Sequence, residues 1–154
     1  MGEVERIAEQ LRRAFEGGAW HGPSVHELLA STTRGQAAKR PIPGAHTIWE
    51  IVLHIGAWES VVRRRLLGES ITDLAPEQDW PPVSDVTETA WRKTLEELEQ
   101  GHLQMRQAIT QVTDERLGES VPGKDYTVCV MLHGIIQHDL YHAGQISLLK
   151  KAFA

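Results

Sequence analysis

One stripe of side chains between residues 87 and 112 constrains the fold more than any other feature of this sequence. Its members follow one another at alternating steps of four and three residues: Trp91, Leu95, Leu98, His102, Met105, Ile109 and Val112. This spacing places them on one face of a helix and is typical of a helix packed into a bundle. We therefore expect the region to form a long helix whose stripe faces other helices.

Three further segments carry apolar residues at helical spacing between breaks that contain glycine or proline. These segments span residues 3–16, 47–67 and 127–151. Thr47, with Glu50 three residues later, predicts the N-cap of the middle segment, and Gly68 predicts its end. The chain thus carries four long helical patterns.

The connections between the long segments indicate the kind of bundle. Residues 69–85 contain three prolines, which predict a long irregular connection. A short extra helix is expected near residues 24–33, because Ser24 and Glu27 have the form of a capping box. No segment has the pattern of a strand. We therefore expect one all-α domain over residues 1–154, a four-helix bundle with long crossover connections.

Composition and charge exclude several classes of function. The formal net charge of −5 argues against a nucleic-acid-binding surface, which needs a basic face. No apolar run of about 20 residues is present to span a membrane, and the charged N-terminus has no signal-peptide segment. Cys129 is the only cysteine, so no disulfide framework is expected. We expect a soluble, cytoplasmic protein with neither nucleic acid nor membrane as partner.

The chain carries eight histidines, and two of them share the buried stripe of the last helical segment. His138 and His142 are four residues apart, which places their Cβ atoms about 5–6 Å apart on one helix face. Met131, Ile135 and Leu149 lie on the same stripe, so this face should point towards the core. Two imidazoles in this arrangement can bind one ion. The pair is predicted to supply two metal ligands.

A divalent metal site needs at least a third protein ligand. His54 lies between Ile51 and Trp58 on the stripe of segment 47–67, and His102 has an equally good position on its own stripe. Spacing alone leaves both open, and either could instead be a neutral core histidine with a hydrogen-bond partner. Four histidines have weaker claims: His21, His26, His46 and His133.

Other polar and aromatic residues have candidate roles around such a site. Glu50 lies one turn before His54, and Asp139 is next to the histidine pair, so each could orient a ligand or simply be solvated. Gln145 could orient a ligand, bind substrate or lie in a subunit contact. Trp20 and Trp58 are expected to pack in the core rather than to line a pocket. No catalytic residue is predicted, because phosphate-binding loops, nucleophile elbows, HExxH and CxxC motifs are all missing.

Three stretches of the sequence together resemble the DinB-like family, whose YfiT-like members are described as metal-dependent enzymes. The stretches are residues 20–24, 46–55 and 133–146, the last with a His-x-x-x-His motif followed by Gly-Gln-Ile. The resemblance implies a crossed-over four-helix bundle, commonly paired as a homodimer, with one metal on three histidines. The family pattern maps onto His54, His138 and His142 and places no ligand at His102.

The resemblance also implies a chemistry. Nickel or zinc is the metal it suggests, although imidazole ligands alone would also accept copper or iron. Some relatives resemble transferases and isomerases that use low-molecular-weight thiols such as bacillithiol or mycothiol. A metal would lower the pKa of a bound thiol or water and supply a nucleophile near neutral pH. We expect a metal-dependent enzyme of thiol-dependent transferase or hydrolase type that acts on a small molecule; the alternative is a non-catalytic, metal-stabilised stress or binding protein acting as a homodimer.

Overall fold

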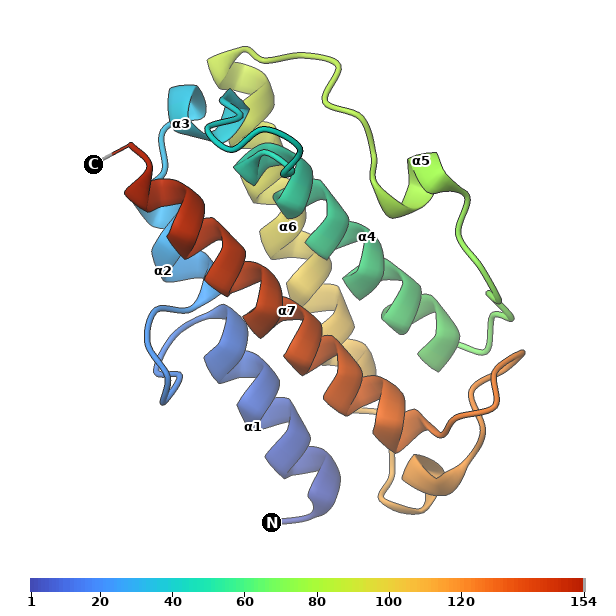
Figure 1. The fold of residues 1–154 in the computed structure, drawn as a ribbon. Coiled ribbons are helices and arrows are strands. Elements are labelled where there is room, and N and C mark those ends of the chain that lie inside the picture. The colour runs from blue at the N-terminus through green and yellow to red at the C-terminus, as the bar shows by residue number, and fades with distance from the viewer. Residues whose placement is uncertain (154) are drawn as a thin grey trace.

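The chain forms a bundle of four long helices, which confirms the all-α fold expected from the sequence. The computed structural model describes residues 1–153, so residue 154 of the expected domain lies outside this range. The long helices are α1 (Glu3–Phe15), α4 (Ile48–Leu66), α6 (Glu88–Ile109) and α7 (Val128–Lys151). In Figure 1, α1 and α7 run in one direction and α4 and α6 in the other. Contacts link α1 to α7, α7 to α4, α4 to α6 and α6 to α1, so α6 lies diagonally across the bundle from α7.

Threonine N-caps begin three of the long helices. The side chains of Thr47, Thr87 and Thr127 each accept a hydrogen bond from the backbone N–H three residues later. The starts expected from the sequence are therefore correct to within one residue. The third helix ends at Ile109, earlier than the expected 112, but Val112 remains buried because the following turn keeps it against the core. None of the described helices has the length and apolar character needed to cross a bilayer.

Short helical elements occupy the connections. They are α2 (Val25–Ala30), α3 (Arg34–Ala38), α5 (Pro76–Asp79) and the 3-10 helix η1 (Glu115–Gly118). The short helix expected near residues 24–33 is α2, which starts after the capping box of Ser24 and Glu27 and packs on α7. Because α4 and α6 run in the same direction, the connection between them must cross the length of the bundle (Figure 1). This connection is interrupted by α5, where Pro76 takes the first helical position.

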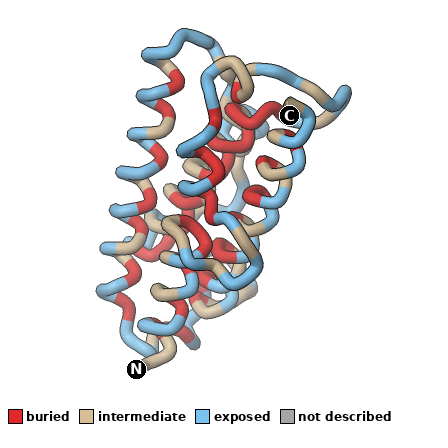
Figure 2. The backbone as a smooth tube through the Cα atoms, turned by 90° about the vertical axis from the view of Figure 1, so that its left-hand side faces the viewer, coloured by how far each residue is buried: buried red, intermediate tan, exposed pale blue. Residues whose placement is uncertain are grey.

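The interior consists of two apolar clusters with a polar layer between them. Buried positions alternate with exposed ones along the long helices, as Figure 2 shows. One apolar cluster includes Leu11 and Leu132, and the other includes Trp49 and Ile146. Glu59 of α4, His102 of α6 and Asp139 of α7 are buried at the level between these clusters. We call these three residues the polar layer, and Asp139 places it directly beside His138.

Candidate metal centre

His54, His138 and His142 meet where α4 faces α7. Their ring centroids lie 4.4 to 4.9 Å apart, and one nitrogen from each ring lies within 4.8 Å of the others. The Nε2 atoms of His54 and His138 are 3.0 Å apart. For Zn–N bonds of about 2.0–2.1 Å, two ligand nitrogens are about 2.9 Å apart at a right angle and about 3.4 Å apart in a tetrahedron. The spacing of the His54–His138 pair falls within this range.

Hydrogen bonds on the outer ring nitrogens leave two Nε2 atoms free to bind an ion. His54 Nδ1 lies 2.6 Å from the carbonyl oxygen of Asp79, to which its N–H donates. His142 Nδ1 lies 2.7 Å from Oε1 of Gln145. Metal-binding histidines commonly donate their second N–H in this way, because the bond fixes the ring and the tautomer. Of the roles open to Gln145, the structure supports the orientation of His142.

The contact between His54 and His138 is explained better by an ion between the rings than by a hydrogen bond. Without an ion, the 3.0 Å contact between Nε2 atoms requires a proton on one of them. His54 carries its proton on Nδ1, so the proton would belong to His138 Nε2. The Nδ1 atom of His138 would then be a buried acceptor, and it has no hydrogen-bond partner within residues 1–153. An ion between the rings would take the place of that proton, and His138 Nδ1 could then carry a proton and face the carboxylate oxygen Asp139 Oδ1, which lies 3.8 Å away.

Burial keeps two of these imidazoles in the form that binds metals. It lowers the pKa of His54, whose ring is also close to His138. Burial lowers the pKa of His142 to about 4, with a further contribution from His138. Only a neutral imidazole offers a lone pair to an ion. Both rings are therefore neutral at physiological pH and need not release a proton before they bind.

The connection between α4 and α6 covers His54. The ring of Trp80 stacks on His54 with ring centroids 3.8 Å apart. The ring of His46 also stacks on Trp80, with centroids 3.5 Å apart. The carboxylate of Asp79 accepts a hydrogen bond from Trp58 Nε1 at 2.7 Å. Sequence reasoning missed Asp79 and Trp80. Pro76 could have located α5, but no local signal placed the end of α5 against His54.

His102 belongs to the polar layer and not to the histidine cluster. Its Nδ1 lies 2.8 Å from Oε1 of Glu59, and its ring stacks on Phe15 with centroids 3.7 Å apart. Burial lowers the pKa of His102 to about 3. Burial also raises the pKa of Glu59 well above its ordinary value, and the neighbouring Asp139 adds to this. Glu59 was missed from sequence, although its place on the stripe between Ile55 and Val62 was a usable signal.

The Glu59→Gln variant should gain stability relative to the wild type as the pH rises. The unfolded chain releases the Glu59 proton above pH 4.5, whereas burial keeps the folded carboxyl protonated to a higher pH. The stabilisation from this group is therefore complete below pH 4.5 and declines as the pH rises towards the folded pKa. Glutamine keeps the shape of the glutamate side chain but has no carboxyl group that can ionise. We expect similar stability at pH 5 and a gain of about 1–3 kcal/mol at pH 8, measured by denaturant unfolding at both values.

The matched control for that experiment is Glu96→Gln, because Glu96 is an exposed glutamate on α6. It should leave the pH dependence of unfolding as it is in the wild type. If Glu59→Gln changed the free energy of unfolding equally at pH 5 and pH 8, the raised pKa of Glu59 would be wrong.

The structure decides the role left open for Glu50 and corrects the expected core packing of two tryptophans: Trp58 is only partly buried and lines a groove, and Trp20 is exposed. Glu50 does not contact His54: it accepts a hydrogen bond from the backbone of Thr47 and pairs with Arg40 at 2.8 Å. Its place three residues after the N-cap explains this, since the capping box holds the carboxylate at the helix start. Trp20 is 100% exposed and does not pack in the core. It lies in the turn between α1 and α2, where neither helix reaches it.

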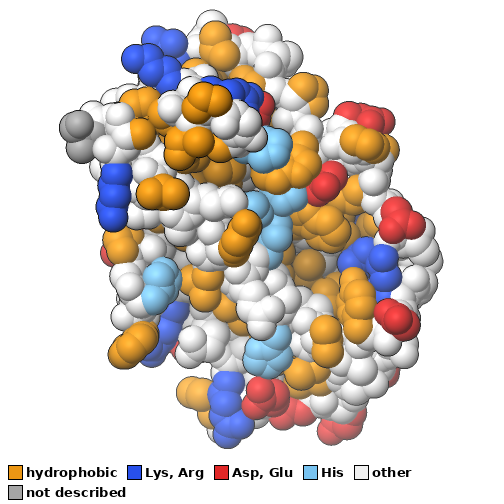
Figure 3. All heavy atoms as spheres, in the orientation of Figure 1, with side chains coloured by type: hydrophobic (Ala, Val, Ile, Leu, Met, Phe, Trp, Pro, Cys, Tyr) orange, Lys and Arg blue, Asp and Glu red, His pale blue; other side chains and the backbone are white. Residues whose placement is uncertain are grey.

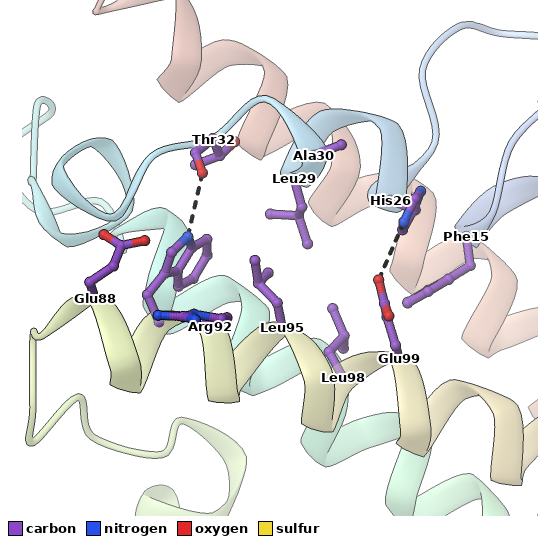
Figure 4. Close-up of a pocket in the computed structure, with 11 residues that line it drawn as sticks. Phe15, His26, Leu29, Ala30, Thr32, Glu88, Arg92, Leu95, Leu98 and Glu99 are labelled. Atoms are coloured by element: carbon purple, nitrogen blue, oxygen red, sulfur yellow. Dashed lines mark hydrogen bonds and ion pairs between the residues drawn. The ribbon is translucent and has the colours of Figure 1, made fainter.

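His46 approaches the cluster through Trp80, whereas His21 and His26 lie apart from it. His26 and Glu99, 3.3 Å apart, lie at a cavity of about 230 Å³ between α2 and α6 (Figure 4). In the same cavity, the indole N–H of Trp91 donates to the carbonyl of Thr32. His21 is exposed. The cavity holds no group of three metal-binding side chains, and among residues 1–153 only His54, His138 and His142 form such a group.

Comparison with known families agrees with this arrangement. A family model described as the DinB superfamily matches residues 18–146, a range that contains the three clustered histidines and most of the bundle. Neither a curated protein nor a solved structure matches the chain. The match covers well over half of the sequence, and the helical bundle is consistent with it. This chain is a member of the DinB superfamily.

Proposed function

We propose that this protein binds one divalent metal ion through His54, His138 and His142 and uses it in a transferase or hydrolase reaction. The observation that carries the proposal is the convergence of three imidazoles from two helices within 4.8 Å. The second observation in its favour is the 3.0 Å contact between the Nε2 atoms of His54 and His138, which an ion between the rings would explain without a proton on either atom. Imidazole ligands suit zinc or nickel, and also copper or iron.

Three protein ligands are typical of catalytic rather than closed structural metal sites, because the fourth position stays open. An ion bound here would act as a Lewis acid and lower the pKa of a water or thiol ligand. The chain's own residues hold the rings and limit water: Asp79 and Gln145 fix two imidazoles, and Trp80 covers one face of His54. His138 keeps 23% of its side chain exposed, so the site can be reached from solvent.

The experiment that tests the proposal loads the purified protein with zinc, nickel or iron(II) in separate samples. Each sample is assayed for conjugation of low-molecular-weight thiols to electrophiles and for hydrolysis of activated esters. We expect one metal to support turnover that a chelator removes and the same metal restores. Metal bound stoichiometrically without turnover in any sample would contradict the catalytic part of the proposal.

A second candidate function is a metal-stabilised, non-catalytic protein that acts as a homodimer. It is favoured by large apolar side chains on the outer face of α7. Val130, Tyr141 and Leu148 share this face and are 56%, 66% and 60% exposed. These side chains would be covered if this face of α7 packed against the same face of a second copy of the protein. Dimers in sedimentation experiments, together with bound metal and no turnover, would favour this candidate over the enzyme.

A further inference from the structure

A groove of about 330 Å³ lies beside the histidine cluster, between α4 and α7. Its walls are mainly apolar and include Trp58 and Val62 from α4 and Met131 and Ile135 from α7. Figure 3 shows this region as a hollow lined with hydrophobic side chains, next to the histidines at the centre of the view. His138 lines the groove too, so the groove and the candidate metal centre share a residue.

One wall of the groove carries a buried positive charge without a negative partner. Arg65 is 3% exposed. Its Nε and Nη2 donate to the carbonyl of Ile71, and its Nη1 donates to the hydroxyl of Tyr126. A guanidinium has five N–H donors, so these three bonds leave two donors free. No carboxylate oxygen within residues 1–153 lies within 4.0 Å of its nitrogens. Buried charges are normally paired, so this one lacks its usual counter-charge.

We propose that the groove binds small organic anions with an apolar body, and that Arg65 pairs with their carboxylate. A carboxylate matches the planar guanidinium and accepts two hydrogen bonds from it. The apolar body would lie on Trp58, Val62 and Ile135. As a substrate site, the groove rests on the proposed metal-dependent function; as a binding site it does not need the metal.

Trp58 connects the two ends of the groove and sets the length of the ligand. Its ring centroid lies 6.1 Å from that of His138, and the guanidinium carbon of Arg65 lies 6.0 Å from the Trp58 ring. Trp58 and Arg65 are seven residues apart on α4, a rise of about 10 Å. A medium-chain carboxylate held at Arg65 therefore extends its far end towards His138. Octanoate is a suitable probe of this length.

Calorimetric titration of the chelated, metal-free protein with octanoate and with octanamide tests the proposal. Without metal, the carboxylate can bind only to the protein itself. We expect octanoate to bind at least tenfold more tightly than octanamide, which has the same apolar chain and no charge. Arg65→Met should remove this preference. Equal affinities of the wild type for the two probes would overturn the proposal.

A second variant keeps the test valid if Arg65→Met destabilises the fold. Gly134 lines the groove, and a Cβ added to it meets no heavy atom within 4 Å. Gly134→Leu should therefore fold, fill the groove and abolish binding of octanoate. Gly101→Leu is the matched control, because Gly101 lies within α6, has equally open space and does not line the groove. Octanoate binding retained by Gly134→Leu would contradict the proposed site.

The same titrations separate this inference from the proposed function. A protein that binds octanoate but no metal would leave the groove intact as a site and refute the metal-dependent reaction. A protein that binds metal but not octanoate would refute the groove alone.

Discussion

His142→Ala is expected to lose stoichiometric metal and to weaken zinc binding by at least about 100-fold. Removal of a residue that merely orients a ligand already lowers metal affinity by about 10- to 100-fold, and this variant removes a ligand itself. The two remaining imidazoles, from His54 and His138, would have to hold the ion from different helices. Elemental analysis after dialysis measures occupancy, and competition with a zinc-binding dye measures affinity.

His133→Ala is the matched control for this experiment. His133 lies on the same helix, but 49% of its side chain is exposed and its nearest charged partner is Glu3. It should keep the metal content of the wild type. Full metal occupancy in His142→Ala would show that the three-histidine assignment is wrong, whatever the activity of the protein.

Trp49→Ala is expected to lower the free energy of unfolding by about 3–5 kcal/mol, because it empties a large volume in the core. Trp49 is 2% exposed and links α4 to α6. Its indole N–H donates to the hydroxyl of Thr94 at 3.1 Å, and its ring lies 5.0 Å from that of Trp91. Denaturant unfolding followed by circular dichroism measures the loss.

The control variant is Trp20→Ala, which removes the same side chain from a fully exposed position. It should change the free energy of unfolding by no more than about 0.5 kcal/mol. Similar losses in Trp20→Ala and Trp49→Ala would mean that burial in the interior does not account for the effect.

The long helices could be predicted from sequence because their signals are local. The stripe from Trp91 to Val112 and the threonine N-caps each depend on residues a few positions apart. The pair His138 and His142 is local in the same sense, since one helical turn separates the two residues. The third ligand is not local. His54 and His102 occupy equivalent places on their own stripes, and only the packing order distinguishes them: α4 is a neighbour of α7, whereas α6 lies across the bundle.

The residues that support the candidate site could not be located in the same way. Asp79 and Trp80 reach His54 because the crossover connection folds back on α4, and the course of a loop depends on tertiary contacts. Glu59 lies on a stripe that is otherwise apolar, but its partners His102 and Asp139 come from two other helices. A pattern along one helix can show that a polar residue is buried. It cannot show which residues of other helices are its hydrogen-bond partners.

The separation of 84 positions along the sequence between His54 and His138 has a consequence for the unfolded chain. Before His54 could join an ion already held by His138, an unfolded chain would have to close this loop. The entropy of closure opposes such an event by about 4–5 kcal/mol. An ion would therefore select the folded chain, and free metal at about 100 times its dissociation constant would raise the free energy of unfolding by about 2.7 kcal/mol. In a protein with a single cysteine, such an ion would act as a reversible cross-link between distant parts of the chain.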